Sequence, residues 1–148
     1  MPKDLAIFLV LFAASLPGVG QADDGRITSP ARPSAMFTPE GKPERLDFKF
    51  GGDITGWIRN KGGWHVEGTV GHTGLLCGTY ELGMRFGVSE PGCSQVHWLS
   101  ELEYGTRVTQ CNNASQHHDG GGYIPALAKD FDRITCAELV IRCTGNCK

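Results

Sequence analysis

An alternation of apolar and polar residues between Cys77 and Phe86 is the feature that most constrains how this chain folds. The apolar positions are Tyr80, Leu82, Met84 and Phe86. A period of two places these four side chains on one face of a β-strand and the residues between them on the other. Because the apolar face must be covered, the segment predicts a core strand of a β-sheet.

Similar alternation recurs along most of the chain. It predicts further strands at Leu46–Phe50, Ile54–Arg59, Trp64–Val70, Val96–Leu99, Leu102–Val108 and Arg133–Cys143. The turn sequence Asn60-Lys61-Gly62-Gly63 makes residues 53–70 the clearest hairpin, since glycine accepts the positive φ that tight turns require. Pro125 is placed to begin one short helical turn near residues 125–130. We therefore predict an all-β fold, a small disulfide-linked antiparallel sandwich or barrel.

The N-terminus predicts export. Lys3 precedes an apolar run from Leu5 to Leu16, and Gly20-Gln21-Ala22 supplies the small residues of a cleavage site. The run is shorter than the ~20 residues of a membrane span, so we interpret residues 1–22 as a cleavable signal peptide; an uncleaved anchor or a buried helix is the alternative. The expected location is periplasmic or secreted, with no membrane span after cleavage.

Residues 23–45 differ in composition from the rest. Pro30, Pro33, Pro39 and Pro43 lie among Ser, Thr, Gly and charged residues. Proline lacks an amide donor and biases the preceding residue away from helix, so we expect a Pro-rich linker or disordered arm. The β domain is then predicted to span residues 46–148.

Six cysteines follow the predicted signal peptide: Cys77, Cys93, Cys111, Cys136, Cys143 and Cys147. An even number in an exported chain predicts three disulfides, with 15 possible connectivities. On one straight strand Cys136 and Cys143 would lie about 23 Å apart, too far to pair. Cys136 should therefore bond to Cys77, Cys93 or Cys111. Zinc on the Cys143-x3-Cys147 pair is the competing interpretation, and an oxidising compartment disfavours it.

His117-His118-Asp119 lies in a polar segment, residues 110–122, that we predict to be a loop. These side chains are candidates for zinc or copper ligands, and His118 for a general base. Neighbours in an extended segment point apart, however, so a solvated loop is the favoured interpretation. His65, His72 and His97 lie on other elements and could complete such a site only through the fold.

Glu101 and Glu103 are the second catalytic candidate. Two residues apart on a strand, their carboxylates would lie about 7 Å apart on one face, a spacing that glycoside hydrolases use. The interleaved Leu102 and Tyr104 favour an ordinary solvent-facing side instead.

Trp57 is the binding candidate among the three tryptophans. It is out of phase with Ile54 and Ile58 and is expected to face away from them, where an aromatic ring either packs on a second sheet or contacts a ligand. Trp64 and Trp98 share phase with Val66 and Val96, and we expect both in the core.

The sequence therefore predicts a non-enzymatic binding or accessory module that recognises a protein or a cell-envelope glycan outside the cytoplasm. A net charge of −2 gives no basic footprint for nucleic acid. There is no Ser-centred nucleophile elbow or phosphate loop, and no cofactor is expected. The alternatives are a small secreted hydrolase that uses the histidine segment or the glutamate pair, and a secreted inhibitor or structural envelope protein.

Overall fold

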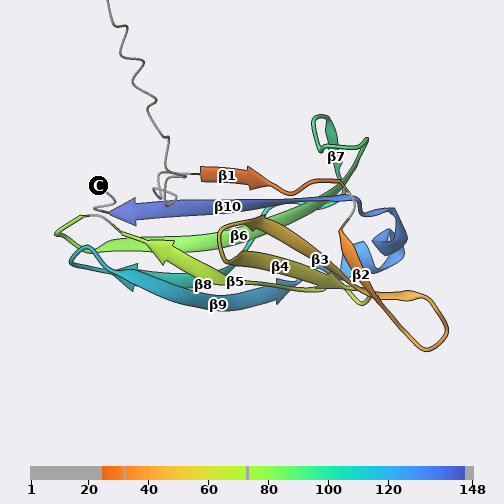
Figure 1. Cartoon of the computed structure of the whole chain (residues 1–148), viewed down its shortest axis with the longest axis horizontal. Coiled ribbons are helices and arrows are strands. Elements are labelled where there is room, and N and C mark those ends of the chain that lie inside the picture. The colour runs from red at the N-terminus through yellow and green to blue at the C-terminus, as the bar shows by residue number, and fades with distance from the viewer. Residues whose placement is uncertain (1–24, 32, 73, 146–148) are drawn as a thin grey trace, which may run out of the picture.

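The computed structural model describes residues 25–31, 33–72 and 74–145, which form two antiparallel five-stranded sheets (Figure 1). Sheet A has the order β2 (Ser34–Phe37), β3 (Pro43–Gly51), β4 (Ile54–Arg59), β5 (Gly63–Gly71) and β9 (Ser115–Tyr123). Sheet B has the order β1 (Gly25–Thr28), β10 (Cys136–Gly145), β6 (Gly78–Ser89) and β7 (Val96–Trp98), and β8 (Glu103–Gln110) also pairs with β6. Two short 3-10 helices, η1 (Pro125–Lys129) and η2 (Phe131–Arg133), join β9 to β10.

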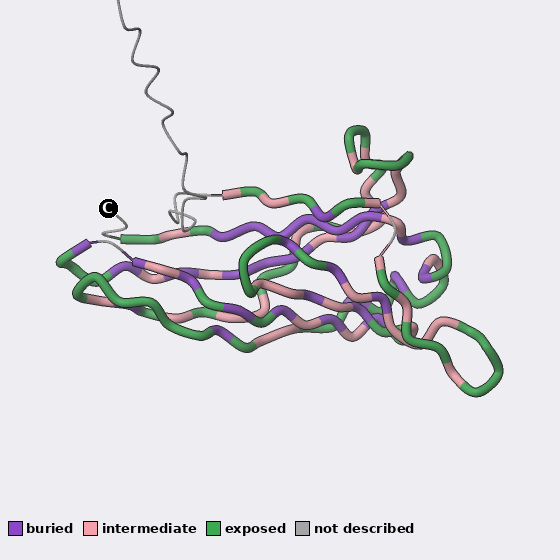
Figure 2. Tube along the Cα trace, viewed as in Figure 1, coloured by how far each residue is buried: buried purple, intermediate pink, exposed green. Residues whose placement is uncertain are grey.

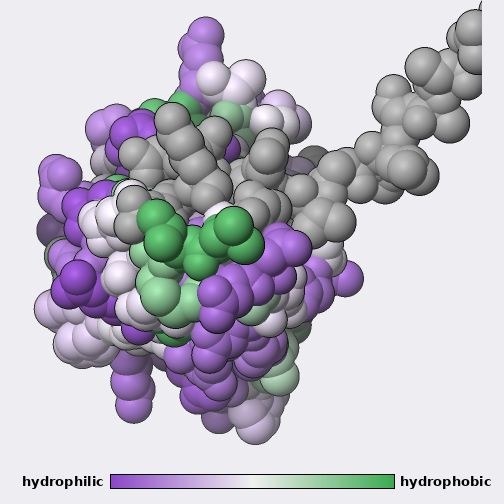
Figure 3. All heavy atoms as spheres, turned by 90° about the vertical axis from the view of Figure 1, so that its left-hand side faces the viewer, coloured by the Kyte–Doolittle hydropathy of each residue, from purple (hydrophilic) through white to green (hydrophobic). Residues whose placement is uncertain are grey.

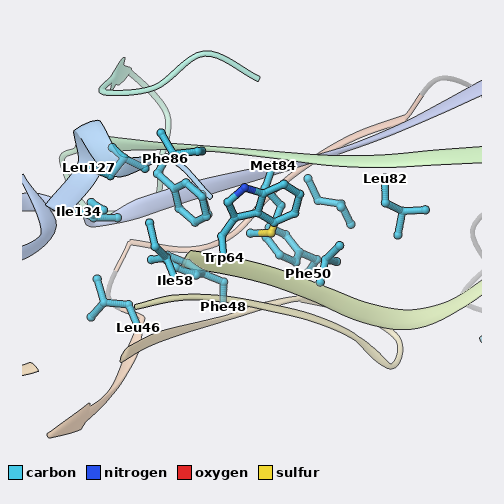
Figure 4. Packing of buried hydrophobic residues seen from close by; sticks show 14 of the residues in the cluster. Leu46, Phe48, Phe50, Ile58, Trp64, Leu82, Met84, Phe86, Leu127 and Ile134 are labelled. Carbon is cyan, nitrogen blue, oxygen red and sulfur yellow. The ribbon is translucent and has the colours of Figure 1, made fainter. Parts of the chain in front are cut away.

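The two sheets pack face to face and enclose the hydrophobic core, as Figure 4 shows for part of it. Buried and more exposed positions alternate along β3 and β5, whereas the first six residues of β10 are all buried (Figure 2). Sheet A contributes Leu46, Phe48, Phe50, Ile58, Trp64, Val66 and Val70, and sheet B contributes Tyr80, Leu82, Met84, Phe86, Ala137, Leu139 and Ile141. Leu127 and Ile134, from the helical connection, extend the core at one end.

The predicted fold class is confirmed. The apolar stripe of β6 is at most 1% exposed. The hairpin of β4 and β5 forms around the predicted turn, with Ile58 opposite Trp64. Pro125 starts the predicted helical turn, in 3-10 rather than α geometry.

Two segments differ from the prediction. Part of residues 23–45, expected to be a linker or disordered arm, is strand: β1 pairs with β10, and β2 pairs with β3, which itself begins at Pro43. Residues 110–122, expected to be a polar loop, contain most of β9, which pairs with β5 over nine residues. The cause in both cases is that backbone pairing with an existing strand outweighs weak local β-propensity.

Glycines in β8 and β9 explain how such a polar strand packs against the core. A Cβ on Gly105 would lie 2.5 Å from the Trp64 ring and 2.6 Å from the carbonyl oxygen of Gly121. A Cβ on Gly120 would likewise collide with the Thr106 Cβ. The two strands belong to different sheets, so this contact closes one side of the sandwich through bare backbone.

Disulfides join the loops to sheet B. Cys77 bonds to Cys111, and Cys93 bonds to Cys136, with Cα–Cα distances of 4.1 and 6.0 Å. The inference that Cys136 bonds to Cys77, Cys93 or Cys111 is therefore confirmed. Cys143 is also disulfide-bonded, and Cys147 lies outside the described residues.

The predicted signal peptide, residues 1–22, lies outside the described residues. Within the ranges that the structure describes, no helix combines the length and the apolar character that crossing a bilayer requires.

A small apolar patch lies at the end of the molecule where β6 begins (Figure 3). Leu75 and Leu76, in the connection from β5 to β6, are 83% and 63% exposed. His72 is buried below them and anchors the connection: its Nε2 donates to the carbonyl oxygen of Leu76 over 2.6 Å, and the Tyr80 hydroxyl donates to its Nδ1 over 2.7 Å. These hydrogen bonds and the adjacent Cys77–Cys111 disulfide hold the two leucines in place.

We predict that Gly105→Ala destabilises the protein by about 2 kcal/mol or more, because the new methyl group collides with backbone that cannot rotate away. Gly63→Ala is the matched control, since a Cβ at that strand position meets nothing within 4 Å. Urea unfolding of both variants measures the difference. Equal midpoints would show that β8 and β9 do not depend on the glycine contact.

Candidate functional site

The candidate functional residues gather on the outer face of sheet A, the face that points away from the core. The core occupies one side of this sheet, so the intervening residues of β3, β4, β5 and β9 must point to the other side. Cross-strand register aligns them in rows: Asp47, Trp57 and His65 form one row, and Thr55, Glu67 and Asp119 form the next.

Trp57 lies at the centre of this face and is half-buried by its neighbours. Its ring stacks on the imidazole of His65, with centroids 5.0 Å apart and an interplanar angle of 18°. The guanidinium groups of Arg45 and Arg59 lie 5.4 and 5.3 Å from the Trp57 centroid, within cation–π range. Arg45 also forms an ion pair with Asp47 over 2.7 Å.

A polar group adjoins the tryptophan through His65. The His65 Nε2 lies 2.8 Å from an Asp119 carboxylate oxygen. Glu67 is directly opposite Asp119 in the pairing of β5 with β9, and the Thr55 hydroxyl donates a hydrogen bond to it. One potential ligand atom from each of His65, Glu67 and Asp119 lies within 4.8 Å of the others.

Asp53 borders the same face at the turn between β3 and β4. The hydroxyl and the amide of Thr69 donate hydrogen bonds of 2.6 and 3.1 Å to its carboxylate. These bonds, the hydroxyl's first, lower the pKa of Asp53 below its ordinary value. This carboxylate is therefore already engaged by Thr69.

The predicted His117-His118-Asp119 group does not assemble as one site. Because the three residues are consecutive on β9, His117 and Asp119 share the exposed face, whereas His118 is 1% exposed on the core side. Asp119 is instead joined by His65, which comes from a different strand. Of the candidate metal ligands, only Asp119 belongs to the group described above.

Glu101 and Glu103 lie with sheet B and not with sheet A. Glu103 begins β8 and pairs with Met84 of β6 in sheet B, and Glu101 precedes the strand. Both are exposed. The fold therefore does not bring this carboxylate pair together with the histidine and carboxylate group of sheet A.

The two remaining tryptophans lie in different environments. Trp64 is 3% exposed in the core, as predicted. Trp98 is half-buried on the outer side of sheet B, where its ring covers the Arg85 guanidinium at 4.0 Å, so its predicted core position is wrong. Trp98 is opposite Gly87 of β6, which follows the inward-facing Phe86 and therefore shares the outer face with Arg85.

His118 is held neutral by its surroundings. The Gln110 side-chain amide donates to the Val70 carbonyl oxygen over 3.0 Å and to His118 Nε2 over 2.7 Å. The accepting Nε2 assigns the proton to Nδ1. Burial, and secondarily the nearby charge of His117, lower the pKa of His118 below 6.5.

Sequence reasoning named His65 only as one of three histidines that the fold could add to the site, and it missed Glu67, Arg45 and Arg59. The turn around Lys61 contained part of the signal, because a pairing centred on that residue places Trp57 opposite His65. The position of Asp119 carried no comparable signal, since it depends on β9 pairing with β5 across three intervening strands of the sequence.

Comparison with known proteins adds no functional assignment: the chain matches no protein-family model, and no curated protein or solved structure is significantly similar to it.

We predict that stability decreases as the pH falls below about 6.5, because the unfolded chain then takes up a proton at His118 that the folded protein excludes. His118→Gln retains an acceptor for Gln110 without a titrating ring and should flatten the pH dependence of the urea midpoint between about pH 8 and about pH 5. The exposed His97 provides the control, and His97→Gln should leave the slope as it is. Identical slopes in His118→Gln and the unaltered protein would contradict the assignment.

Proposed function

We propose that this protein is a non-enzymatic binding module that works in the periplasm or outside the cell and recognises a protein partner through the outer face of sheet A. The observation that carries the proposal is the position of Trp57, at the centre of that face and outside the core. Paired cysteines among the described residues support the oxidising location.

The residue types around Trp57 favour a protein partner. Tryptophan and arginine are the side chains that most often carry binding energy in protein interfaces. Here one tryptophan lies within cation–π distance of Arg45 and Arg59. Because these contacts already order the side chains, binding loses less conformational entropy than it would with freely rotating residues.

The stacking geometry argues against a sugar platform. A sugar ring packs on an open aromatic face, whereas the Trp57 ring is stacked with His65 and approached by two guanidinium groups. A pyranose ring would have to compete with these three groups for the ring faces of Trp57, whereas side chains of a protein partner can contact the ring edge. A cell-envelope glycan is therefore the second outcome of the experiment below.

The structure gives the enzymatic alternatives less support than the binding module. A hydrolase that uses the histidine segment needs His117 and His118 together, and they occupy opposite faces of β9. A hydrolase that uses the glutamate pair was expected to hold both carboxylates on one strand, whereas Glu101 precedes β8 and only Glu103 belongs to it. An inhibitor or structural envelope protein would act through the same kind of surface and belongs to the binding class.

We predict that Trp57→Ala reduces partner binding by about 30-fold or more, the loss expected on truncating an interface hot spot worth about 2 kcal/mol. The immobilised, oxidised protein is exposed to culture fluid or envelope extract, and the retained material is identified and titrated. Trp98→Ala is the matched control, because it removes another half-buried tryptophan stacked on an arginine, from sheet B.

Protease treatment of the extract separates the two partner classes. Binding that disappears with protease and weakens in Trp57→Ala supports the proposal. Binding that survives protease but is lost on glycan digestion would replace the protein partner with a glycan. Undiminished binding by Trp57→Ala, or an equal loss in Trp98→Ala, would contradict the assignment of this face.

A further inference from the structure

Two carboxylates on sheet A are placed where they repel each other. Glu67 of β5 and Asp119 of β9 are direct cross-strand neighbours on the exposed face. Like charges directly opposite each other destabilise a sheet. His65 compensates one of them, since its Nε2 contacts Asp119 at 2.8 Å. From the residues that the structure describes, Glu67 receives a hydroxyl hydrogen bond, from Thr55 at 3.4 Å, and no ion pair.

The same three side chains converge as metal ligands do. Their potential ligand atoms, one nitrogen and two carboxylate oxygens, lie within 4.8 Å of one another. Ligand atoms of a tetrahedral Zn²⁺ site, at about 2.1 Å from the ion, are about 3.4 Å apart. Small side-chain rotations bridge this difference, and two paired strands fix the backbones.

Trp57 contributes orientation. Its stack with the imidazole holds the His65 ring, with Nε2 directed at Asp119. An imidazole that is oriented by a neighbour loses less freedom on binding a metal than a freely rotating one. The nitrogen ligand selects borderline transition cations over Ca²⁺ and Mg²⁺, which prefer sites made of oxygen alone.

We propose that His65, Glu67 and Asp119 form a binding site for a divalent transition cation of the Zn²⁺ class on the outer face of sheet A. Three protein ligands leave a fourth tetrahedral position open to solvent. The cation replaces the proton between His65 and Asp119 and neutralises the repulsion between Asp119 and Glu67. The site does not depend on the proposed partner, and its test needs no partner.

Zn²⁺ alone is the probe, added to the purified, oxidised protein prepared without a histidine tag. Calorimetric titration should show one equivalent of Zn²⁺ per chain, and the titration should change the emission of Trp57 through its stack with His65. His65→Ala and Asp119→Asn should each weaken binding at least about tenfold. Asp47→Asn is the matched control, because this carboxylate shares the face but is paired with Arg45.

Glu67→Gln supplies a readout that tests the repulsion directly. Without metal it should raise the thermal midpoint, because it removes one of the two opposed charges while keeping an acceptor for Thr55. With saturating Zn²⁺ the unaltered protein should have the higher thermal midpoint, because it keeps all three protein ligands and is stabilised more by the bound ion.

Three outcomes of the binding experiment would overturn the proposal: no Zn²⁺ binding by the unaltered protein at millimolar metal, binding that is unchanged in both His65→Ala and Asp119→Asn, or binding that is lost in His117→Ala but retained in His65→Ala. His117 is the discriminating residue because it lies two positions from Asp119 on the same exposed face. A glutamine variant that is less stable than the unaltered protein without metal would likewise contradict it.

Discussion

Burial of two facing apolar stripes is the constraint on which the rest of this structure depends. The side chains of β6 pack against those of β3 and β5, and β4 also approaches β6 closely: a Cβ on Gly56 of β4 would lie 2.8 Å from the Met84 sulfur. Shifting any of these strands by one residue would turn its apolar side chains to solvent. Pairing register is therefore fixed by the core rather than by the outer face.

The chemistry of the outer face follows from that register. Trp57 meets His65, and Glu67 meets Asp119, because their inward-facing neighbours are locked in the core. Sheet B has related features on its own outer side, where Arg85 lies over Trp98 and pairs with the nearly buried Glu138. There the guanidinium has a buried carboxylate partner. On sheet A the arginine over Trp57, Arg45, likewise pairs with a carboxylate, that of Asp47. A second carboxylate pair, Glu67 and Asp119, lies directly opposite across the strands, and this pair distinguishes the two faces.

Strand periodicity made much of the fold predictable. The stripe of β6, the hairpin of β4 and β5, and the proline-initiated turn all express local preferences that agree with the final structure. Strand geometry also correctly limited the partners of Cys136, since a straight strand separates it from Cys143.

Elements that depend on distant partners were not predictable in this way. The polar, glycine-rich sequence of β9 has low β-propensity, and it becomes a strand because it adds to the edge of β5 and because Gly105 allows close approach. The short strands β1 and β2 lie among prolines, which a local interpretation assigns to a linker. The candidate site could not be assembled from the sequence because it joins β5 to β9.

The arrangement of β1 and β10 has a mechanical consequence. These adjacent strands run antiparallel, with Gly25 opposite Ile141, so the start of β1 and the end of β10 face the same direction along sheet B (Figure 1). Tension applied between those ends loads the interstrand hydrogen bonds one pair at a time, as in opening a zipper, instead of shearing them together. The weak point under pulling is thus the outermost strand, while the Cys93–Cys136 bridge limits how far β10 itself could be drawn out.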